Sequence, residues 1–410
     1  MTNKTKITMK RIGYCILGSL LLTVKAFAVK PDTVNIENQS VYSYTNGNVY
    51  QSARDKTVIK KYLDGLDENR LDQPNLVRIK LPSAAASDGK FYVSKSADYS
   101  NATITNIKKG DTECIIMNPI PQTLLYSKAV IGGKTVVEKQ TFIDGRVRMI
   151  YVPSVKNVRD MGGWLTDTGQ RVQYGLFYRG GELDFQEQHI ATQEDIDELL
   201  RLGIGADVDL REESESHQTH SALGNNVPYI FKNHASSDYT AIKNDALKWK
   251  EEFQFIVNNL REGKSIYSHC IMGADRTGLQ CFLLGGLLGM NIDQLIKDYE
   301  LTSMAGKDYY RDCSKLILYM EYMNTRNGKN LTERFYNYFR NDLNITDKYI
   351  RDFRKIMLEG YESYLKTTDI EDIYEEEATN DDTIYDLSGR AIEKPAKGFY
   401  IQNGKKYLAR

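Results

Sequence analysis

Hydrophobic and polar residues alternate with a period of two over much of the first third of the chain. The stretch 76–81 (LVRIKL) follows this alternation and stops at Pro82, which is typical of a strand with one buried face. Further stretches with a strand-like pattern lie at 90–95, 113–117, 123–131 and 134–142. Asp-Gly and Gly-Gly dipeptides mark turns between several of them. Short, regularly spaced strands predict an all-β domain, a sandwich, over residues 30–150.

From about residue 151 the pattern changes to helices that alternate with strands. Apolar residues recur at helical spacing over 249–260, and short apolar stretches at 206–210 and 265–268 indicate strands. The segment 279–290 is almost wholly apolar, which predicts a buried helix. Further helices are expected at 192–200, 307–326, 331–341 and 347–364. This alternation predicts an α/β domain over 151–375, with a largely parallel sheet flanked by helices.

The two ends of the chain carry other patterns. Positive residues at 4–11 precede an apolar stretch at 12–24 and the triplet AFA at 26–28, which predicts a cleaved secretory signal over 1–28. Residues 376–382 form an acidic linker, and the strand–turn pattern of 383–410 predicts a small β tail. We therefore expect an exported protein that is periplasmic, outer-membrane-associated or extracellular, with no transmembrane segment in the mature chain.

The charge balance and the cysteines narrow the possible partners. The chain has 54 Lys and Arg against 55 Asp and Glu, a net charge of −1, so no nucleic acid partner is expected and any anion site must be local. Cutting after residue 28 leaves four cysteines, Cys114, Cys270, Cys281 and Cys313. They lack the paired C-x-x-C spacing of a structural zinc site, and all except Cys270 are expected in hydrophobic cores.

The segment 269–278 (HCIMGADRTG) is the strongest candidate for chemistry. A predicted buried strand leads into it and a predicted buried helix follows, so its backbone N–H groups can form a concave nest that binds a phosphate. Gly273 would allow the backbone to approach the ligand closely. Arg276 can donate a fork of hydrogen bonds to two phosphate oxygens. The expected phosphate-binding residues are Ile271, Met272, Gly273, Ala274 and Arg276.

The loop N–H groups and the positive charge of Arg276 would also activate Cys270. Cysteines at a helix N-terminus beside an arginine have pKa values of roughly 3.5–7.5, so Cys270 is predicted to be the nucleophile. Thr277 can donate a hydrogen bond to the sulfur, and His269 is expected to orient the loop. Water would then hydrolyse the phosphorylated cysteine, and this chemistry needs no metal and no cofactor.

The leaving group needs a proton, and two carboxylates are candidates for its donor. Asp275 lies within the loop beside Arg276, and it is the first choice as general acid. The alternative is that Asp275 only braces the loop. Asp209, at the carboxyl end of a predicted strand, is the second choice; it could instead form a structural ion pair with Arg211.

Four short segments resemble one known family. Residues 269–278 resemble the H-C-x-x-G-K-D-R-T-G signature of the atypical bacterial protein tyrosine phosphatases. Residues 157–163 (NVRDMGG), 178–183 (YRGGEL) and 209–211 (DLR) are similar to that family's N-F-R-D-x-G-G, Y-R-S-G-x-L and D-L-R segments, in the same order. The resemblance implies the protein tyrosine phosphatase fold, a phosphocysteine intermediate and Asp275 as the acid. Ala274 replaces the signature's Lys, and Gly180 replaces a Ser.

Two further resemblances concern the flanking regions. The β domain over 30–150 is similar in outline to fibronectin type III domains. The tail resembles C-terminal segments of secreted Bacteroidota proteins, some of which address proteins to type IX secretion; a capping hairpin without an address function is the alternative.

The leading hypothesis is a secreted cysteine-dependent phosphatase that acts on phosphotyrosine in proteins or on small phosphomonoesters. A phosphoinositide or inositol phosphate phosphatase is a second hypothesis. It is disfavoured because Ala274 stands where the signature has a Lys, whose positive charge would suit such polyanionic substrates. A secreted binding protein with an inactive phosphatase domain is the third, and the intact set of Cys270, Asp275 and Arg276 argues against it.

Overall fold

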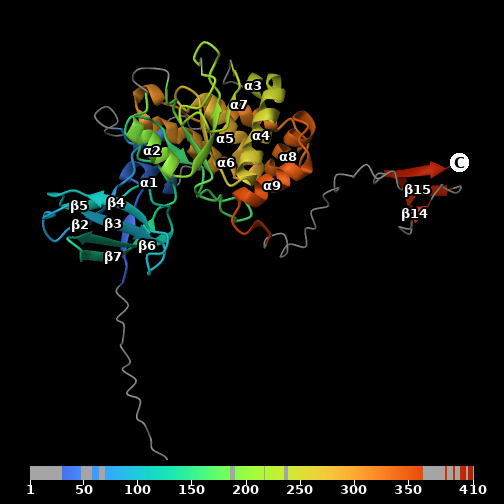
Figure 1. The fold of residues 1–410 in the computed structure, drawn as a ribbon. Coiled ribbons are helices and arrows are strands. Elements are labelled where there is room, and N and C mark those ends of the chain that lie inside the picture. The colour runs from blue at the N-terminus through green and yellow to red at the C-terminus, as the bar shows by residue number, and fades with distance from the viewer. Residues whose placement is uncertain are drawn as a thin grey trace, which may run out of the picture.

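The computed structural model describes residues 30–47, 58–63, 70–184, 190–216, 218–234 and 239–362, together with four short strands near the C-terminus (Figure 1). The predicted secretory signal and the acidic linker 376–382 lie outside the described residues. Within the described ranges, no helix is both long and apolar enough to cross a membrane. The chain has the predicted mixed architecture, with a strand-rich unit before an α/β unit.

The strand-rich unit contains a five-stranded sheet in the order β1-β7-β6-β3-β4 and a two-stranded sheet of β2 and β5. The strands are β1 (Asp32–Asn35), β2 (Val77–Lys80), β3 (Gly89–Ser94), β4 (Thr103–Ile107), β5 (Glu113–Ile116), β6 (Thr123–Ile131) and β7 (Lys134–Asp144). Neighbours pair antiparallel, except β1, which pairs parallel with β7. Alternate residues of these strands form one hydrophobic core, which includes Cys114. The predicted strand region is confirmed, and its fibronectin-like topology stays a prediction.

The α/β unit is built on a second five-stranded sheet, in the order β11-β10-β12-β9-β8. The strands are β8 (Arg159–Asp160), β9 (Phe177–Gly180), β10 (Ile204–Asp209), β11 (Tyr229–Phe231) and β12 (Ser265–His269). All pairs except β8–β9 are parallel. The register sets His269 beside both Gly180 and Asp209, so the carboxyl ends of three strands meet where the candidate loop begins.

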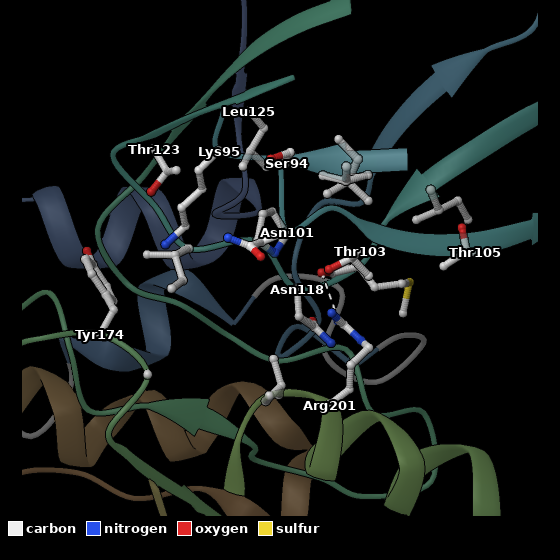
Figure 2. Close-up of a pocket in the computed structure, with 18 of the residues that line it drawn as sticks. Ser94, Lys95, Asn101, Thr103, Thr105, Asn118, Thr123, Leu125, Tyr174 and Arg201 are labelled. Carbon is white, nitrogen blue, oxygen red and sulfur yellow. Dashed lines mark hydrogen bonds between the residues drawn. The ribbon is translucent and has the colours of Figure 1, made fainter. Parts of the chain in front are cut away.

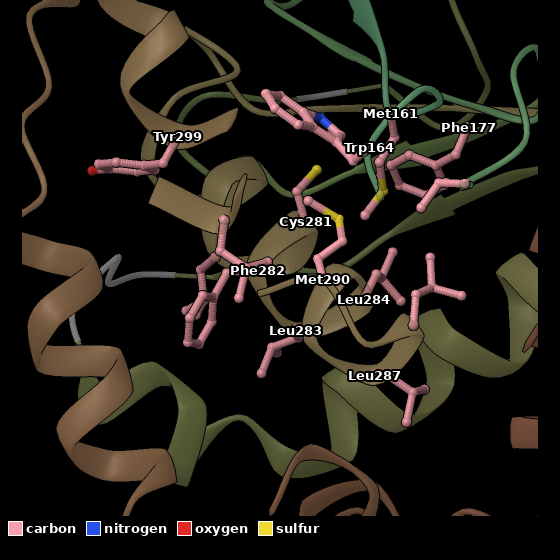
Figure 3. Close-up of a cluster of buried hydrophobic side chains, with 14 of the residues drawn as sticks. Met161, Trp164, Phe177, Cys281, Phe282, Leu283, Leu284, Leu287, Met290 and Tyr299 are labelled. Carbon is pink, nitrogen blue, oxygen red and sulfur yellow. The ribbon is translucent and has the colours of Figure 1, made fainter. Parts of the chain in front are cut away.

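Helices surround this sheet, and one of them is buried along its length. The helices are α2 (Gln193–Arg201), α3 (Tyr239–Asn244), α4 (Ala246–Arg261), α5 (Asp275–Leu288), α6 (Ile292–Glu300), α7 (Ser314–Met323), α8 (Leu331–Asn337) and α9 (Asp347–Met357). Every residue of α5 from Thr277 to Leu288 is buried, as its apolar sequence predicts. Figure 3 shows Cys281 and Phe282 of α5 among the side chains of this core. Cys313 is buried in the same core.

The N-terminal segment differs from the sequence prediction, because part of it packs with the α/β unit. It contains α1 (Gln39–Asn46) and the short 3-10 helix η2 (Ile59–Tyr62). Val41, Tyr44 and Ile59 are buried in the core of the α/β unit. The Lys297 ammonium donates a hydrogen bond to the Thr45 carbonyl (2.9 Å). The helices α1 and η2 therefore do not belong to a β domain that runs unbroken over 30–150.

A small antiparallel sheet forms near the C-terminus. Its order is β14-β13-β15-β16, with β13 (Ile384–Tyr385), β14 (Ala391–Ile392), β15 (Gly398–Gln402) and β16 (Lys405–Ala409). The predicted β tail is therefore present, and its role as a sorting signal stays a prediction.

Candidate active site

The candidate loop joins the central strand β12 to the buried helix α5. Gly273 has a φ of +62°, a left-handed conformation that favours glycine. A Cβ atom on Gly273 would also collide with the carbonyl of Gly180 on the neighbouring strand. Gly273 was expected to allow close approach to a ligand, and the structure adds that it is needed for the loop to pack on β9.

Donors from two distant segments hold the loop carbonyls. The Glu182 N–H donates to the Ile271 carbonyl (2.9 Å). The Asn157 amide donates to the carbonyls of Met272 and Gly273, both at 3.0 Å. Because a trans peptide points its C=O and N–H in opposite directions, carbonyls held from behind turn the loop N–H groups toward the concave side. This arrangement is compatible with the anion nest that the sequence predicts, and phosphate binding by the loop stays a prediction.

A buried ion cluster of Arg159, Arg179 and Asp298 lies beside the loop. The Arg179 guanidinium donates to the Gly273 carbonyl (2.8 Å) and pairs with Asp298 (2.6 Å). Arg159 pairs with the same carboxylate (3.2 Å). Burial opposes ionisation of Asp298, but the two guanidinium groups outweigh it and lower the pKa of this carboxyl. Asn157 has a φ of +64°, and its N–H donates to Asp72 (2.6 Å).

Cys270 lies at the start of the loop, and its side chain is buried. Burial alone would raise the pKa of the thiol. The charge of Arg276 and the neighbouring Thr277 outweigh burial, so the pKa of Cys270 is lowered from its ordinary value. Arg276 thus acts on the sulfur as expected, whereas the buried Thr277 hydroxyl makes no hydrogen bond within the described residues, so its donation to the sulfur stays a prediction.

Arg276 is positioned by a residue that sequence reasoning missed. Both terminal nitrogens of its guanidinium donate to the carboxylate of Glu215. A guanidinium carries five N–H groups, so Glu215 can hold the end of Arg276 while other N–H groups stay free for a phosphate.

His269 lies beneath the loop as a buried cation. Its Nε2 is 3.3 Å from the Asp207 carboxylate. Burial alone would lower its pKa, but Asp209 and Asp207 outweigh burial and raise the pKa of His269 to about 9. A protonated imidazole cannot act as a base, which is compatible with the orienting role expected for His269.

Asp209 forms the ion pair that was the alternative to its role as an acid. Its carboxylate pairs with Arg211 (2.7 Å) and accepts hydrogen bonds from Ser216 (2.9 Å) and Tyr229 (2.8 Å). Despite the effect of burial, His269 and Arg211 hold the pKa of Asp209 well below its usual range. In this arrangement Asp209 carries no proton to donate.

Asp275 is also an ionised acceptor in this arrangement. It receives hydrogen bonds from Arg311 (2.7 and 2.9 Å), Lys315 (2.8 Å) and Tyr299 (2.9 Å). Burial opposes ionisation, but Arg311 and then Lys315 outweigh it and lower the pKa of Asp275 to about 2. The carboxylate lies in the loop as expected, and it has to bind a proton before it can act as an acid.

The two departures from the family segments, Ala274 in place of Lys and Gly180 in place of Ser, have physical explanations. Ala274 is fully buried, and the positive charge beside the loop comes instead from Arg311 and Lys315. At Gly180 a Cβ atom would collide with the hydroxyl of Tyr267, which donates to the Gly181 carbonyl (2.7 Å). Tyr267 therefore occupies space that a serine at position 180 would need.

The residues that sequence reasoning missed fall into two groups. Asn157, Arg179 and Glu182 lie in segments whose family resemblance was visible, so their importance was signalled although their contacts were not. Glu215 and Arg311 lie in no such segment, and only the folded chain brings them to the loop.

Comparison with known proteins gives the family. The model of the tyrosine phosphatase family matches residues 150–372, more than half of the chain. The chain therefore belongs to the tyrosine phosphatase family. Within the described residues, no cluster of three or more His, Cys, Asp or Glu side chains could hold a metal ion.

Individual relatives are distant. A Cupriavidus necator protein whose name ascribes it to the tyrosine-protein phosphatases is 26% identical over 168 residues, which cover 36% of this chain and 60% of that protein. Among solved structures, TpbA of P. aeruginosa is 15% identical with a TM-score of 0.27, over 41% of this chain and 91% of TpbA. Tk-PTP in its active form is 17% identical with a TM-score of 0.26, over 44% of this chain and 98% of Tk-PTP.

Proposed function

We propose that this protein is an exported phosphatase that hydrolyses phosphate monoesters through a phosphocysteine intermediate. The observation that carries the proposal is the loop after β12. There, a thiol of lowered pKa begins a loop whose carbonyls accept hydrogen bonds from Asn157 and Arg179, and the charge of Arg276 acts on this thiol. The membership of the tyrosine phosphatase family supports it. Export rests on the pattern of residues 1–28.

The proposed reaction has two displacements at phosphorus. The Cys270 thiolate attacks, an S–P bond forms, and the ester P–O bond breaks with its electron pair leaving on the alcohol or phenol oxygen. Water then attacks the thiophosphate, releasing inorganic phosphate and restoring the thiolate. Arg276 and the loop N–H groups stabilise the charge on the equatorial oxygens in both steps.

The state of Asp275 favours aryl phosphates as substrates. A phenol leaves more readily than an alkyl alcohol because its pKa is only about 10. An enzyme whose proposed acid is held as a carboxylate by Arg311 and Lys315 should depend on such a leaving group. Phosphotyrosine is therefore the proposed substrate class.

One observation favours a second candidate, hydrolysis of phosphoinositides or inositol phosphates. Arg311 and Lys315 place two positive charges beside the loop, which offsets the missing lysine at position 274. A second phosphate on the substrate could pair with these groups if it displaced Asp275.

The test is hydrolysis of p-nitrophenyl phosphate in EDTA by the wild type, by Cys270→Ser and by Cys114→Ser. The last variant makes the same change at a buried cysteine of the strand-rich unit. Activity that is lost only in Cys270→Ser supports the proposal. An inactive, folded wild type would overturn it and favour the binding-protein hypothesis, whereas equal activity in all three proteins would overturn the assignment of Cys270 as the nucleophile.

A substrate panel separates the two candidates. A phosphotyrosine peptide and the phosphoserine peptide of otherwise identical sequence test the aryl preference. Inositol hexakisphosphate and phosphoinositide vesicles test the polyanion candidate. Faster hydrolysis of the inositol compounds than of the phosphotyrosine peptide would favour the second candidate.

A further inference from the structure

A cleft of about 720 Å³ lies between the strand-rich unit and the α/β unit. This is within the range of roughly 300–1,000 Å³ that is typical of small-molecule sites. Figure 2 shows side chains entering it from the sheet on one side and from α2 and the 174–178 region on the other. None of the residues proposed for catalysis lines this cleft, so an inference about the cleft does not depend on the proposed function.

The cleft exists because the second layer of the strand-rich unit is narrow. Among the described residues, the two-stranded sheet of β2 and β5 shares the core of the five-stranded sheet, and it leaves part of one face of β3 and β4 open. Phe91 pairs with Thr105, and Val93 with Thr103, and all four line the cleft. Thr103 and Thr105 are exposed. A closed sandwich core would carry apolar residues at such positions, so this face is suited to contact with a partly polar ligand.

The floor of the cleft is apolar. Phe91, Ile116 and Leu125 contribute buried side chains, and Met117, Ile120 and Leu202 are partly buried beside them. Apolar surface of this kind, enclosed on two sides, stabilises the apolar body of a ligand by removing it from water.

The charge in the cleft is positive. Lys95 extends from the sheet side toward the α/β unit (Figure 2). Within the described ranges, its ammonium has no hydrogen bond or ion pair. The Glu198 carboxylate is already engaged, since it pairs with Arg201 (2.6 Å) and accepts from the Asn118 amide (2.6 Å). A cationic ligand would therefore meet no open carboxylate there, whereas an anion would meet Lys95.

We propose that this cleft binds a small amphipathic anion, whose apolar body lies on Phe91 and Leu125 and whose acidic group pairs with Lys95. The hydroxyls of Thr103 and Thr105 can accept or donate hydrogen bonds to polar atoms along the ligand. The chemical class is an organic carboxylate, sulfonate or phosphate ester with an aliphatic or aromatic body.

The test is a fluorescence titration of the full chain with 8-anilinonaphthalene-1-sulfonate, followed by displacement with dodecanoate. Three variants are compared: Lys95→Glu reverses the charge, Thr103→Trp fills the cleft, and Lys90→Glu is the control. Lys90 lies on β3, which ends one residue before Lys95, and its side chain is also exposed, but it bonds to Asn106 and does not line the cleft. Circular dichroism checks that every variant is folded.

The expected result is saturable binding at one site, weakened about tenfold by Lys95→Glu, abolished by Thr103→Trp and unchanged by Lys90→Glu. Dodecanoate should displace the probe. An absence of saturable binding, or binding that survives Thr103→Trp, would overturn the site. Binding that Lys95→Glu leaves unchanged would overturn the assignment of an anion. Because binding is measured directly, these outcomes do not depend on phosphatase activity.

Discussion

The loop carbonyls should control activity, and Asn157 offers a sharp test. Asn157→Asp keeps the size of the side chain and its tolerance of positive φ, but it replaces the two N–H donations to Met272 and Gly273 by a negative acceptor. The side-chain oxygen that already accepts from Arg159 is retained. The loop should then lose the orientation of its N–H groups without loss of the fold.

The magnitude follows from the two hydrogen bonds, each 3.0 Å long. A hydrogen bond contributes about 1 kcal/mol net, so about 2 kcal/mol of loop organisation is lost. If that loss falls on the transition state, kcat/KM falls about 30-fold. Repulsion between the new carboxylate and the carbonyls makes this a lower bound.

The assay is kcat/KM for p-nitrophenyl phosphate, measured well below the thermal midpoint of each protein. Asn118→Asp is the matched control, because Asn118 also has positive φ (42°) and a buried side chain with an amide donor. The control should lose stability and keep kcat/KM. If Asn157→Asp stays within threefold of the wild type, or if the control loses as much activity, the role given to the loop carbonyls is refuted.

Three other changes should have measurable effects. Glu215→Gln removes the partly exposed carboxylate that pairs with Arg276. If this ion pair contributes about 1 kcal/mol to positioning Arg276, kcat/KM for p-nitrophenyl phosphate should fall about fivefold. An increase in kcat/KM would mean that Glu215 competes with substrate. Because the pKa of His269 is raised from 6.5 to about 9, the stability from its protonation is complete below pH 6.5 and lost as pH rises through 9. Urea unfolding should show the wild type losing about 3 kcal/mol more than His269→Gln across that window, and equal losses would contradict the buried cation. Gly180→Ser should cost about 1–3 kcal/mol by overpacking against Tyr267, and adding Tyr267→Phe should restore part of it in urea unfolding; a fully stable single variant would show that no clash exists.

The periodicity of the chain was sufficient to predict the buried helix α5 and many of the strands, but it missed others, among them β1, β4 and β11. Alternation over 76–81 and the apolar run over 279–290 each depend on local burial, which one strand or helix reports by itself. The packing of α1 and η2 against the α/β unit was not predictable in this way. Val41 and Tyr44 lie at helical spacing, but nothing nearby in the sequence indicates that their partner surface is more than 200 residues further along the chain.

The same distinction between local and distant contacts holds for the candidate site. Cys270, Gly273 and Arg276 lie within one short loop, so their chemistry can be inferred from spacing alone. The ionisation of Asp275 could not, because it is set by Arg311 and Lys315, which lie 36 and 40 residues further along the chain and reach the loop only through the fold. Glu215 likewise reaches Arg276 from a different connection of the sheet.

The docking of the N-terminal segment limits how this catalytic unit can be inherited. The family match begins at residue 150, yet Asp72 holds the backbone of Asn157 and Tyr44 bonds to the buried Glu300. A gene fragment encoding only the matched region would give a chain that lacks Val41, Tyr44 and Ile59 from its core and the Asp72 contact to Asn157. Recombination that moves this phosphatase into a new gene must therefore carry the upstream segment with it, or supply another that fits the same surface.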